Sequence, residues 1–344
     1  MTTEAVAVNG SHANGTTAAG TTLLTVENMV QEFKVSKRGS YRKAIVSAVA
    51  GVTFEIMRGE TFAIVGETGS GKSTLARALI RAPGPKGGSI NLNGHDLTGP
   101  HAASMREVGQ LAQMIFQDPF SALNPKWTIE KIITEPLATA GMPKNTARRR
   151  KVAEIMERVG LSASQFAHRY PYEISGGQAQ RVAIGRALVS APDLVICDEP
   201  VTALDVSIQA QILKLLSVLK QELALTYLLI AHDLAVVRVL SDRTGTMYLG
   251  KFCEIGGTAA MFDHPAHPYT DALLSAIPPR PGQTLERQRI RLQGEPPSPL
   301  SPPAGCRFHT RCAYAQDVCK VEEPKMRQVA PNQSVACHFP LIGS

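Results

Sequence analysis

The sequence predicts an α/β fold with a largely parallel sheet, on three observations. Short apolar runs of strand character alternate with amphipathic helical segments along the chain. A glycine-rich loop at 66–73 stands between an apolar run and a helical segment. A second apolar run, at 194–197, ends in two acidic residues. Strands that alternate with helices are typical of parallel sheets covered by helices, and 344 residues allow one large domain and a smaller one.

The first half of the chain predicts an arm, three strands and a helix. Residues 1–21 are rich in Gly, Thr, Ala and Asn without periodicity, so we expect a disordered arm. LLTVENMV (23–30) predicts a strand, and AVAGVTFEIMRGETFAIVG (48–66) predicts two strands joined by a turn at Arg58-Gly59. TARRRKVAEIMERV (146–159) predicts a helix. Its apolar stripe consists of Val152, Ile155, Met156 and Val159.

The second half of the chain predicts further alternation of strands and helices, followed by a segment rich in proline and then in cysteine. DLVICDEP (193–200) and TYLLIAHD (226–233) predict buried strands, and SIQAQILKLLSVLKQEL (207–223) predicts an amphipathic helix between them. From 277 to 305 the chain is rich in proline, which predicts an extended linker. A cysteine-rich segment follows this linker.

Composition excludes some classes of protein. The first twenty residues lack the basic and apolar regions of a secretory signal. The most apolar stretch, 225–240, is interrupted by His232, Asp233 and Arg238, so we expect no membrane span. The formal net charge is +7, with basic clusters at 34–43 and 148–151. These clusters fit either solvated faces or surfaces that attract phosphates or anionic membranes.

The glycine-rich loop has the pattern G-x4-G-K-S that binds nucleotide phosphates. Its glycines let backbone N–H groups converge on the phosphates, and the following helix presents its positive N-terminal end. Lys72 is placed to reach the β- and γ-phosphates, and the Ser73 hydroxyl to bind Mg²⁺. The predicted nucleotide-binding residues of this loop are Gly66, Glu67, Thr68, Gly69, Ser70, Gly71, Lys72, Ser73 and Thr74.

Two further motifs fit a nucleotide. Asp198, at the end of an apolar strand, can deliver a carboxylate to Mg²⁺, and Glu199 can polarise a water for attack on the γ-phosphate. Ser175, Gly176, Gly177 and Gln178 open a helix and form a second anion site. Because one γ-phosphate does not need two cradles from one chain, we expect this site to serve a nucleotide bound to a second subunit.

Over residues 22–275 these motifs resemble those of ATP-binding-cassette (ABC) transporter ATPases. The resemblance implies a P-loop NTPase core in that range, with an antiparallel β subdomain and an α-helical subdomain at about 118–175. A small Cys-rich C-terminal extension would lie in 276–344, after the linker. The resemblance to ABC transporter ATPases also implies that the chain hydrolyses ATP in a head-to-tail dimer.

The resemblance assigns roles to three more residues. Gln117 matches the glutamine that senses magnesium and links the site to a membrane partner, and Asp205 matches the loop that crosses the dimer. His232 matches the histidine that holds the γ-phosphate. The expected catalytic residues are therefore Lys72, Gln117, Glu199 and His232, and the expected Mg²⁺ ligands are Ser73, Gln117 and Asp198.

The residue that stacks on adenine is less defined. Phe33 fits best and Tyr41 second, with a packed core aromatic as the alternative for Phe33. Ile174, Ala179 and Thr202 depart from the residues usual in the family, but none of these departures removes a catalytic group.

Three stretches narrow the resemblance to one group. QDPFSALNP (117–125), SIQAQIL (207–213) and HPAHPYTDALLSAIP (264–278) resemble ATPases of oligopeptide and dipeptide importers, a group that also handles nickel and glutathione. This implies a bacterial importer with a second, homologous ATPase, two membrane-spanning permease subunits and an extracytoplasmic peptide-binding protein. The chain would then be peripheral, at the cytoplasmic face of the inner membrane. An ABC ATPase that acts on nucleic acid is the alternative that the positive charge suggests.

Four of the six cysteines, Cys306, Cys312, Cys319 and Cys337, lie near the C-terminus. Disulfides are uncommon in the cytosol, and the spacing is not the C-x2-C of zinc ribbons, although His309 and His338 could serve as zinc ligands. Free thiols on a small packed extension also fit. Four thiolates can hold an iron–sulfur cluster, and the resemblance implies one, since the ATPases resembled here often end in a similar extension that is reported to hold a [4Fe–4S] cluster in some members. We predict such a cluster, with Zn²⁺ as the alternative.

Overall fold

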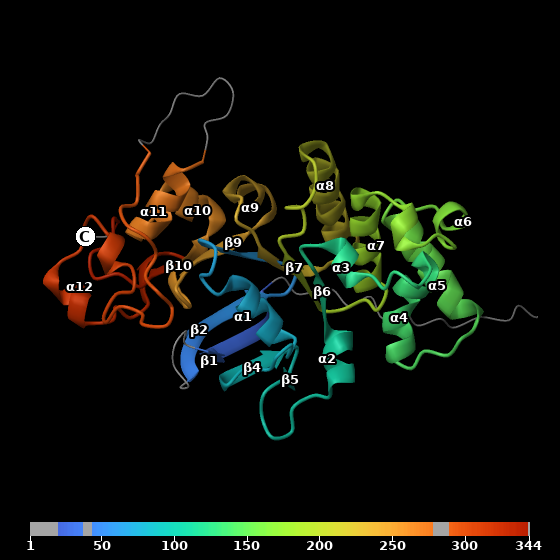
Figure 1. Cartoon of the computed structure of the whole chain (residues 1–344), viewed down its shortest axis with the longest axis horizontal. Helices are drawn as coiled ribbons and strands as arrows, with labels where there is room; N and C mark the ends of the chain where they lie inside the picture. Colours follow the sequence, from blue (N-terminus) through green and yellow to red (C-terminus); the bar gives the residue numbers. More distant parts are fainter. Residues whose placement is uncertain (1–19, 37–42, 278–288, 343–344) are drawn as a thin grey trace, which may run out of the picture.

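A computed structural model describes residues 20–36, 43–277 and 289–342, and its centre is an eight-stranded sheet (Figure 1). The strand order is β11-β12-β10-β9-β3-β8-β7-β6. The five strands from β9 to β6 run parallel, which confirms the predicted α/β class. These are β3 (Thr61–Val65), β6 (Ala112–Ile115), β7 (Leu194–Asp198), β8 (Thr226–Ile230) and β9 (Arg243–Tyr248).

Some predictions fall outside the described residues. The predicted disordered arm does so up to residue 19, as do Tyr41, most of the basic cluster at 34–43, and residues 278–288 of the proline-rich segment.

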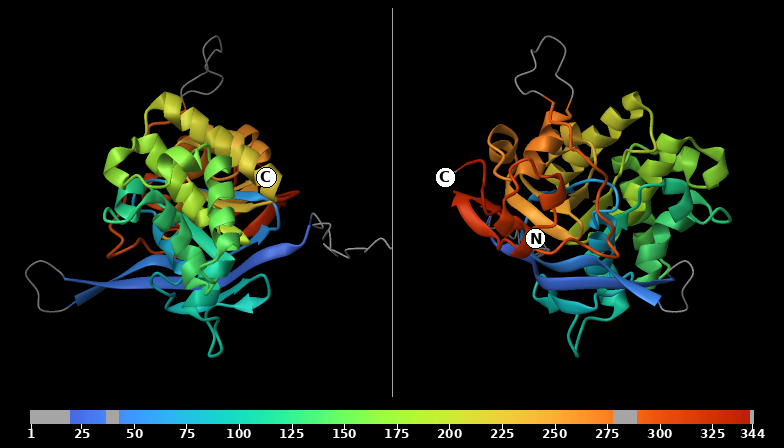
Figure 2. Two further views of the ribbon diagram at one scale, coloured as in Figure 1. Left: turned by 90° about the vertical axis from the view of Figure 1, so that its right-hand side faces the viewer. Right: turned by 60° about the vertical axis from the view of Figure 1, so that its left-hand side comes forward.

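A four-stranded antiparallel sheet forms the predicted β subdomain, in the order β2-β1-β4-β5 (Figures 1 and 2). Helix α1 (Lys72–Leu79) lies between this sheet and the central one. Leu75 and Leu79 of α1 belong to one buried cluster with Phe54 of β2 and Phe62 of β3. The strands are β1 (Thr22–Ser36), β2 (Lys43–Met57), β4 (Gly87–Leu92) and β5 (His95–Asp96).

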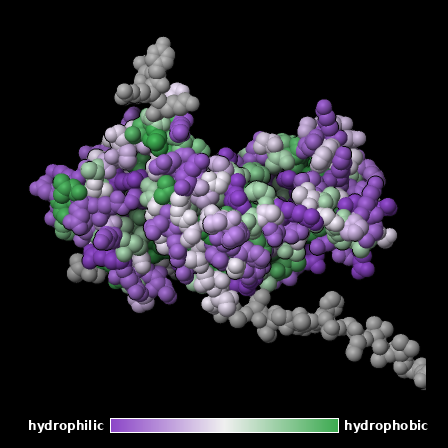
Figure 3. Space-filling view, turned by 90° about the horizontal axis from the view of Figure 1, so that it is seen from below, coloured by the Kyte–Doolittle hydropathy of each residue, from purple (hydrophilic) through white to green (hydrophobic). Residues whose placement is uncertain are grey.

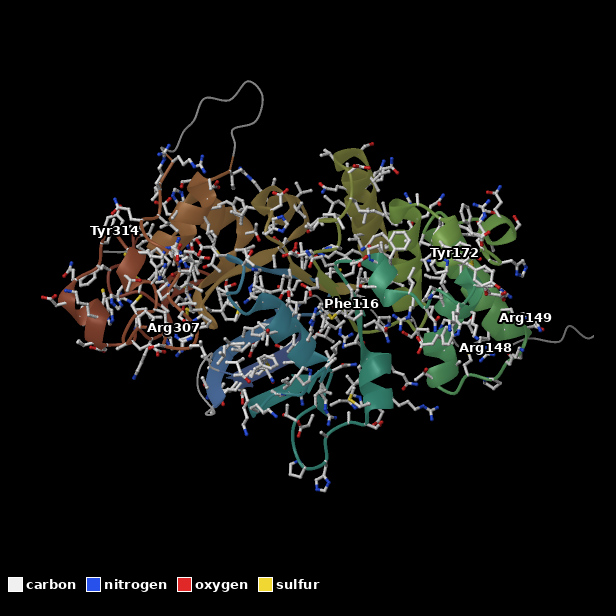
Figure 4. The ribbon with its side chains drawn as sticks, in the orientation of Figure 1. Phe116, Arg148, Arg149, Tyr172, Arg307 and Tyr314 are labelled. Atoms are coloured by element: carbon white, nitrogen blue, oxygen red, sulfur yellow. The ribbon has the colours of Figure 1, made fainter. Side chains whose placement is uncertain are left out.

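Helices at one end of the molecule form the predicted helical subdomain (Figure 1). The stripe predicted on 146–159 is buried, and it packs in one cluster with Ile129, Ile132 and Ile133 of α4 and Val182 of α7. The basic residues Arg148 and Arg149 lie at the far end of this subdomain (Figure 4). The elements at this end are α3 (Pro119–Ala122), α4 (Ile129–Thr139), α5 (Thr146–Arg158), α6 (Ala163–Phe166), the 3-10 turn Pro171–Glu173 and α7 (Gly176–Leu188), which follows the predicted range directly. Helix α2 (Met105–Leu111) precedes that range, and its Val108 belongs to the buried cluster that includes Leu75 of α1.

The remaining helices cover the face of the central sheet opposite the β subdomain (Figure 1). Ile212 and Leu216 of the predicted helix at 207–223 pack in the same buried cluster as Leu229 of β8. These helices are α8 (Val206–Leu223), α9 (Leu234–Leu240), α10 (Thr258–Asp263) and α11 (Pro268–Ser275).

The C-terminal segment adds two strands to the central sheet. Strand β12 (Gln333–Val335) pairs antiparallel with β10 (Lys251–Gly257) and with β11 (Arg327–Ala330). The segment also contains the 3-10 turn His309–Arg311 and α12 (Asp317–Val321). The sequence predicted a separate module beyond the linker and did not predict this pairing. The strands pair because β10 would otherwise leave its outer backbone groups unpaired.

The described residues present a mostly hydrophilic surface in the view from below, with hydrophobic side chains in small groups (Figure 3). Among the helices that the structure describes, none is long and apolar enough to cross a bilayer.

A buried carboxylate fastens the C-terminal segment to the cassette. Glu254 on β10 is 0% exposed. It accepts hydrogen bonds from the backbone N–H groups of Ala266 and His267, both at 2.9 Å, and from Gln333 Nε2 at 2.7 Å. Three donors offset the cost of burying this charge. The carboxylate thereby joins β10, the entry to α11 and β12.

We expect Glu254→Ala to lower the free energy of unfolding by about 3 kcal/mol, because three buried donors lose their acceptor. Urea denaturation monitored by circular dichroism measures this change. Glu322→Ala, at an exposed position of the same C-terminal segment, should change stability by less than about 0.5 kcal/mol. Equal stability of the two variants would contradict the role of Glu254.

Candidate functional site

The glycine-rich loop packs closely against the backbone of β9, in the central sheet, and of β2, in the β subdomain. It leaves β3 at Val65 and enters α1 at Lys72. Gly66 and Gly71 have φ of 153° and 106°. A Cβ at Gly66 would lie 2.1 Å from the Met247 carbonyl oxygen, and one at Gly71 would lie 2.2 Å from the Ala48 carbonyl oxygen. Only glycine therefore fits at either position.

Lys72 points back over the loop. Its Nζ donates to the carbonyl oxygens of Gly66 at 2.8 Å and Glu67 at 3.0 Å, and it lies 3.4 Å from Ser70 Oγ. Burial lowers the pKa of Lys72, while the carboxylates of Glu199 and Asp198 oppose that shift. The ammonium is thus held within the loop, where phosphate oxygens can replace the carbonyls.

Two of the three residues predicted to bind Mg²⁺, Ser73 and Asp198, lie next to each other, whereas Gln117 Nε2 donates to Glu199. Ser73 Oγ donates to Asp198 Oδ1 at 2.8 Å. Asp198 ends β7 and is 3% exposed, so burial raises the pKa of its carboxyl, while the Ser73 hydrogen bond opposes the shift. A hydroxyl and a buried carboxylate are oxygen ligands of the kind that Mg²⁺ takes. The residues present therefore fit this cation.

Glu199 contacts two other predicted catalytic residues, Gln117 and His232. Its Oε2 accepts from Gln117 Nε2 at 2.9 Å and lies 3.3 Å from His232 Nδ1. Its φ is 49°, a left-handed conformation that costs energy for a residue other than glycine and is found at functional sites. Gln117, Glu199 and His232 are distant in sequence, but the structure brings them together as the motif order predicts.

Sequence reasoning missed one neighbour of Glu199. Thr202 Oγ1 donates to the same Oε2 at 3.2 Å. In the sequence, Thr202 stands out only as a departure from the residue usual in the family. A hydroxyl three residues after the acid was the available signal, because a turn at that spacing brings the two side chains together. Thr202 therefore helps to orient the carboxylate.

The loop and these side chains face one pocket of about 460 Å³. Ala48 of β2 contributes to it and was not predicted. This pocket has room for phosphate groups beside both a cation site and a carboxylate that can accept a proton from water. Its lining residues are Ala48, Thr68, Gly69, Gly71, Lys72, Ser73, Thr74, Gln117, Glu199 and His232.

Other predicted site residues lie outside the lining of this pocket. Ser175 caps α7, where its N–H donates to Gln178 Oε1 at 2.9 Å and its Oγ accepts from the Gln178 N–H at 3.4 Å. Asp205 precedes α8, and Phe33 is a 38% exposed residue of β1. The roles predicted for Ser175–Gln178 and Asp205 need a second subunit, and the role of Phe33 needs a bound base. They stay predictions.

The four C-terminal cysteines line one small pocket together with His309 and His338. Each is a free thiol within the described chain. Burial raises the pKa of Cys306 and of Cys337 to about 11. Among the described residues, no group of three or more His, Cys, Asp or Glu side chains is arranged to hold a metal ion. The pocket gathers the predicted thiols without forming a ready metal site.

The two remaining cysteines are packed in the interior, as expected. Cys197 of β7 is 1% exposed, and burial raises its pKa to about 12. Cys253 of β10 belongs to a small buried cluster with Tyr248, Tyr269 and Phe308.

Two family models match the chain. The ABC transporter model matches residues 49–202, which include the glycine-rich loop, Gln117, the Ser175–Gln178 segment and Glu199. A model described as the oligopeptide/dipeptide transporter C-terminal region matches residues 253–319, which include three of the four C-terminal cysteines.

Three relatives are similar to the chain over most of its length. The oligopeptide transport ATP-binding protein AppF of Bacillus subtilis is 48% identical over 328 residues, covering 94% of this chain and 99% of that protein. The di/tripeptide transport ATP-binding protein DppF of Pseudomonas aeruginosa is 44% identical, covering 92% of this chain and 97% of its own length. The dipeptide transport ATP-binding protein DppF of Haemophilus influenzae is 43% identical over 92% of this chain and 96% of its own.

A solved structure has the same fold. The dimeric ATP-binding cassette MJ0796, bound to ADP and phosphate in a post-hydrolysis state, superposes with a TM-score of 0.60 at 26% identity. The match covers 69% of this chain and 99% of that one.

We expect Glu199→Gln to lower kcat for ATP hydrolysis by at least ~100-fold, because an amide cannot accept the proton of water. Binding of ATP should persist, since the amide still fits between Gln117 and His232. Phosphate release and equilibrium nucleotide binding measure the two effects. Glu222→Gln, at an exposed position on α8, is the matched control and should hydrolyse ATP as the wild type does. Unchanged turnover in Glu199→Gln would refute the proton-acceptor role.

Proposed function

The chain belongs to the ABC transporter ATP-binding proteins of the oligopeptide and dipeptide group, and from this we propose that it hydrolyses ATP to drive import of oligopeptides or dipeptides through partner membrane subunits. The observation that carries the hydrolytic part is the Glu199 carboxylate, held by Gln117, Thr202 and His232 in the pocket of Lys72. Similarity to peptide transport proteins over more than nine-tenths of the chain supports the substrate class.

The geometry suggests how ATP would be hydrolysed. Backbone N–H groups of the glycine-rich loop and the Lys72 ammonium would bind the β- and γ-phosphates. Ser73 and Asp198, with Gln117, would hold Mg²⁺, which would neutralise charge on the phosphoryl oxygens. Glu199 would accept the proton of the attacking water, and His232 would contact the γ-phosphate.

We propose that a second, homologous ATPase subunit completes each site. Ser175–Gln178 open α7 outside the lining of the chain's own phosphate pocket, and the first backbone N–H groups of a helix have no partner within the helix, as an anion site needs. Val206, directly after Asp205, is 82% exposed. A large apolar side chain uncovered beside the predicted crossing loop fits a surface that a second subunit covers. A head-to-tail pair would bring the Ser175–Gln178 segment of one subunit to the loop of the other.

The membrane partners are also proposals. Gln117 contacts Glu199 and stands immediately before α3, where Phe120 is 44% exposed. A shift at the γ-phosphate can thus reach a surface of the helical subdomain, where permease subunits would dock. We infer two permeases, an extracytoplasmic peptide-binding protein, and a peripheral location at the cytoplasmic face of the inner membrane.

Reconstitution tests the proposal. The chain would be purified with the permeases, sister ATPase and binding protein encoded beside it and placed in liposomes. We expect peptide-loaded binding protein to raise the ATPase rate and peptide to accumulate, and Lys72→Ala to abolish both. If nickel or glutathione, and not peptide, raised the ATPase rate, that solute would be the substrate instead of peptide. Salt-sensitive DNA binding without stimulation by any of these solutes would overturn the transport function.

For the four C-terminal cysteines we propose a thiolate-held [4Fe–4S] cluster, with Zn²⁺ as the alternative. Support comes from the shared pocket of Cys306, Cys312, Cys319 and Cys337 and from their free thiols. Such a group would cross-link the segments that carry the four residues. The thiols would have to draw closer together around it. Because metal ligation removes thiol protons, and two of these pKa values lie near 11, binding should weaken as the pH falls.

Metal and acid-labile sulfide analysis of anaerobically purified full-length protein tests the cluster. We expect a brown protein with broad visible absorbance, about four irons per chain, and loss of both in Cys312→Ser. Cys197→Ala, at a buried position outside the pocket, should retain the iron. A colourless, zinc-loaded wild type would favour the alternative, and a metal-free one would overturn both.

A further inference from the structure

One arginine of the C-terminal segment reaches the phosphate-binding loop. Arg311, in the 3-10 turn His309–Arg311, donates through Nη1 to Glu67 Oε2 at 2.7 Å, across 244 positions of sequence. The Arg311 side chain is 7% exposed and that of Glu67 is 28% exposed. The contact therefore joins a buried guanidinium to a carboxylate inside the nucleotide loop.

Glu67 is held at its backbone as well. Its N–H donates to the Tyr269 hydroxyl at 2.8 Å, and its carbonyl oxygen accepts from Lys72 Nζ at 3.0 Å. One residue thus connects α11, the C-terminal segment and the lysine that would bind phosphate. The side-chain contact and both backbone contacts of Glu67 therefore lie within one short loop.

Buried aromatic packing fixes the position of Arg311. Tyr248, Tyr269 and Phe308 pack with ring centroids 4.8 to 5.3 Å apart. The Arg311 Nη1 lies 3.4 Å from the Tyr248 hydroxyl, and Cys306 and Cys312 pack against the same cluster. The C-terminal segment that carries this packing, with Arg307 and Tyr314, lies at the opposite end of the molecule from the helical subdomain, where Tyr172 lies (Figure 4).

The ion pair of Arg311 and Glu67 changes the charge that the loop presents to the phosphates of ATP. A guanidinium stays charged at any physiological pH, and Nη1 of Arg311 donates to the Glu67 carboxylate at 2.7 Å. The Nε of Arg311 has no partner among the described residues, so the buried charge depends on the Nη1 contacts, of which Glu67 supplies the only carboxylate that the structure describes. An unpaired carboxylate at Glu67 would repel the phosphates of ATP, whereas the pair is neutral.

We propose that Arg311 is a positioning residue for ATP. From the C-terminal segment it neutralises and orients Glu67, so that the loop N–H groups and Lys72 are preset for the phosphates. This rests on the proposed ATPase function of the same site. The hydrogen bonds of the Arg311 side chain go to Glu67 and Tyr248 and not to Glu199, so its effect should fall on nucleotide affinity and not on the chemical step.

The test is the kinetics of Arg311→Ala in the full-length chain. We expect KM for ATP, and Kd for a fluorescent ATP analogue, to rise on the order of fivefold to tenfold, with kcat at saturating ATP changed less than about twofold. Arg311→Lys should restore part of the affinity, since it keeps a charge but not the fork geometry. Lys320→Ala is the matched control, because its ion pair with Asp317 is exposed in the same segment.

A double-mutant cycle with Glu67→Gln separates this role from mere destabilisation. If Arg311 acts through the Glu67 charge, Arg311→Ala should have less effect on Kd in the Glu67→Gln background than in the wild type. Additive effects, an unchanged Kd in Arg311→Ala, or a loss confined to kcat would overturn the proposal. Nucleotide binding needs neither permease nor peptide, so a wild type that binds ATP without transporting peptide would count against the transport function alone.

Discussion

The close approach of the glycine-rich loop to two neighbouring backbones is the constraint on which the rest of the structure depends. Gly66 lies against the Met247 carbonyl of β9, and Gly71 against the Ala48 carbonyl of β2, at distances that leave no space for a Cβ. The loop is thereby pressed between the central sheet and the β subdomain. Because both sheets hold it, α1 begins at a fixed place, and Lys72 is delivered to the pocket without a flexible loop to order.

The parallel strands account for the rest of the pocket. The loop follows β3, Asp198 and Glu199 lie at the end of β7, and His232 follows β8, with β8 paired between β3 and β7. Carboxyl ends of adjacent parallel strands meet at one edge of a sheet, which is where ligands bind in open α/β folds. The strained φ of Glu199 fits this account, since a sharp turn at the strand end aims the carboxylate at the pocket.

Features that depend on local sequence patterns could be predicted, whereas contacts between residues far apart in the sequence could not. The strands and helices of the cassette have local periodicity, and the residues of the phosphate pocket other than Ala48 belong to motifs of fixed local order. The strands β11 and β12 are short, and β12 pairs with β10 more than seventy positions earlier, so no local pattern announces them. The contact of Thr202 with Glu199 depends on the turn that follows β7, and that of Arg311 with Glu67 spans most of the chain. Phe33 could not be settled because stacking on adenine leaves no distinctive spacing.

The C-terminal segment is attached to the cassette both at the edge of the central sheet and at the phosphate-binding loop. Glu254 and the β10–β12 pairing fix it to the edge of the central sheet. Arg311 and the aromatic cluster fix it to the phosphate-binding loop. A segment held at one place can swing without consequence, but one held at both can move only if the sheet edge or the loop moves with it. Since Cys306 and Cys312 pack against that aromatic cluster, a change in the state of these thiols has a short, packed route to Glu67 and the nucleotide site.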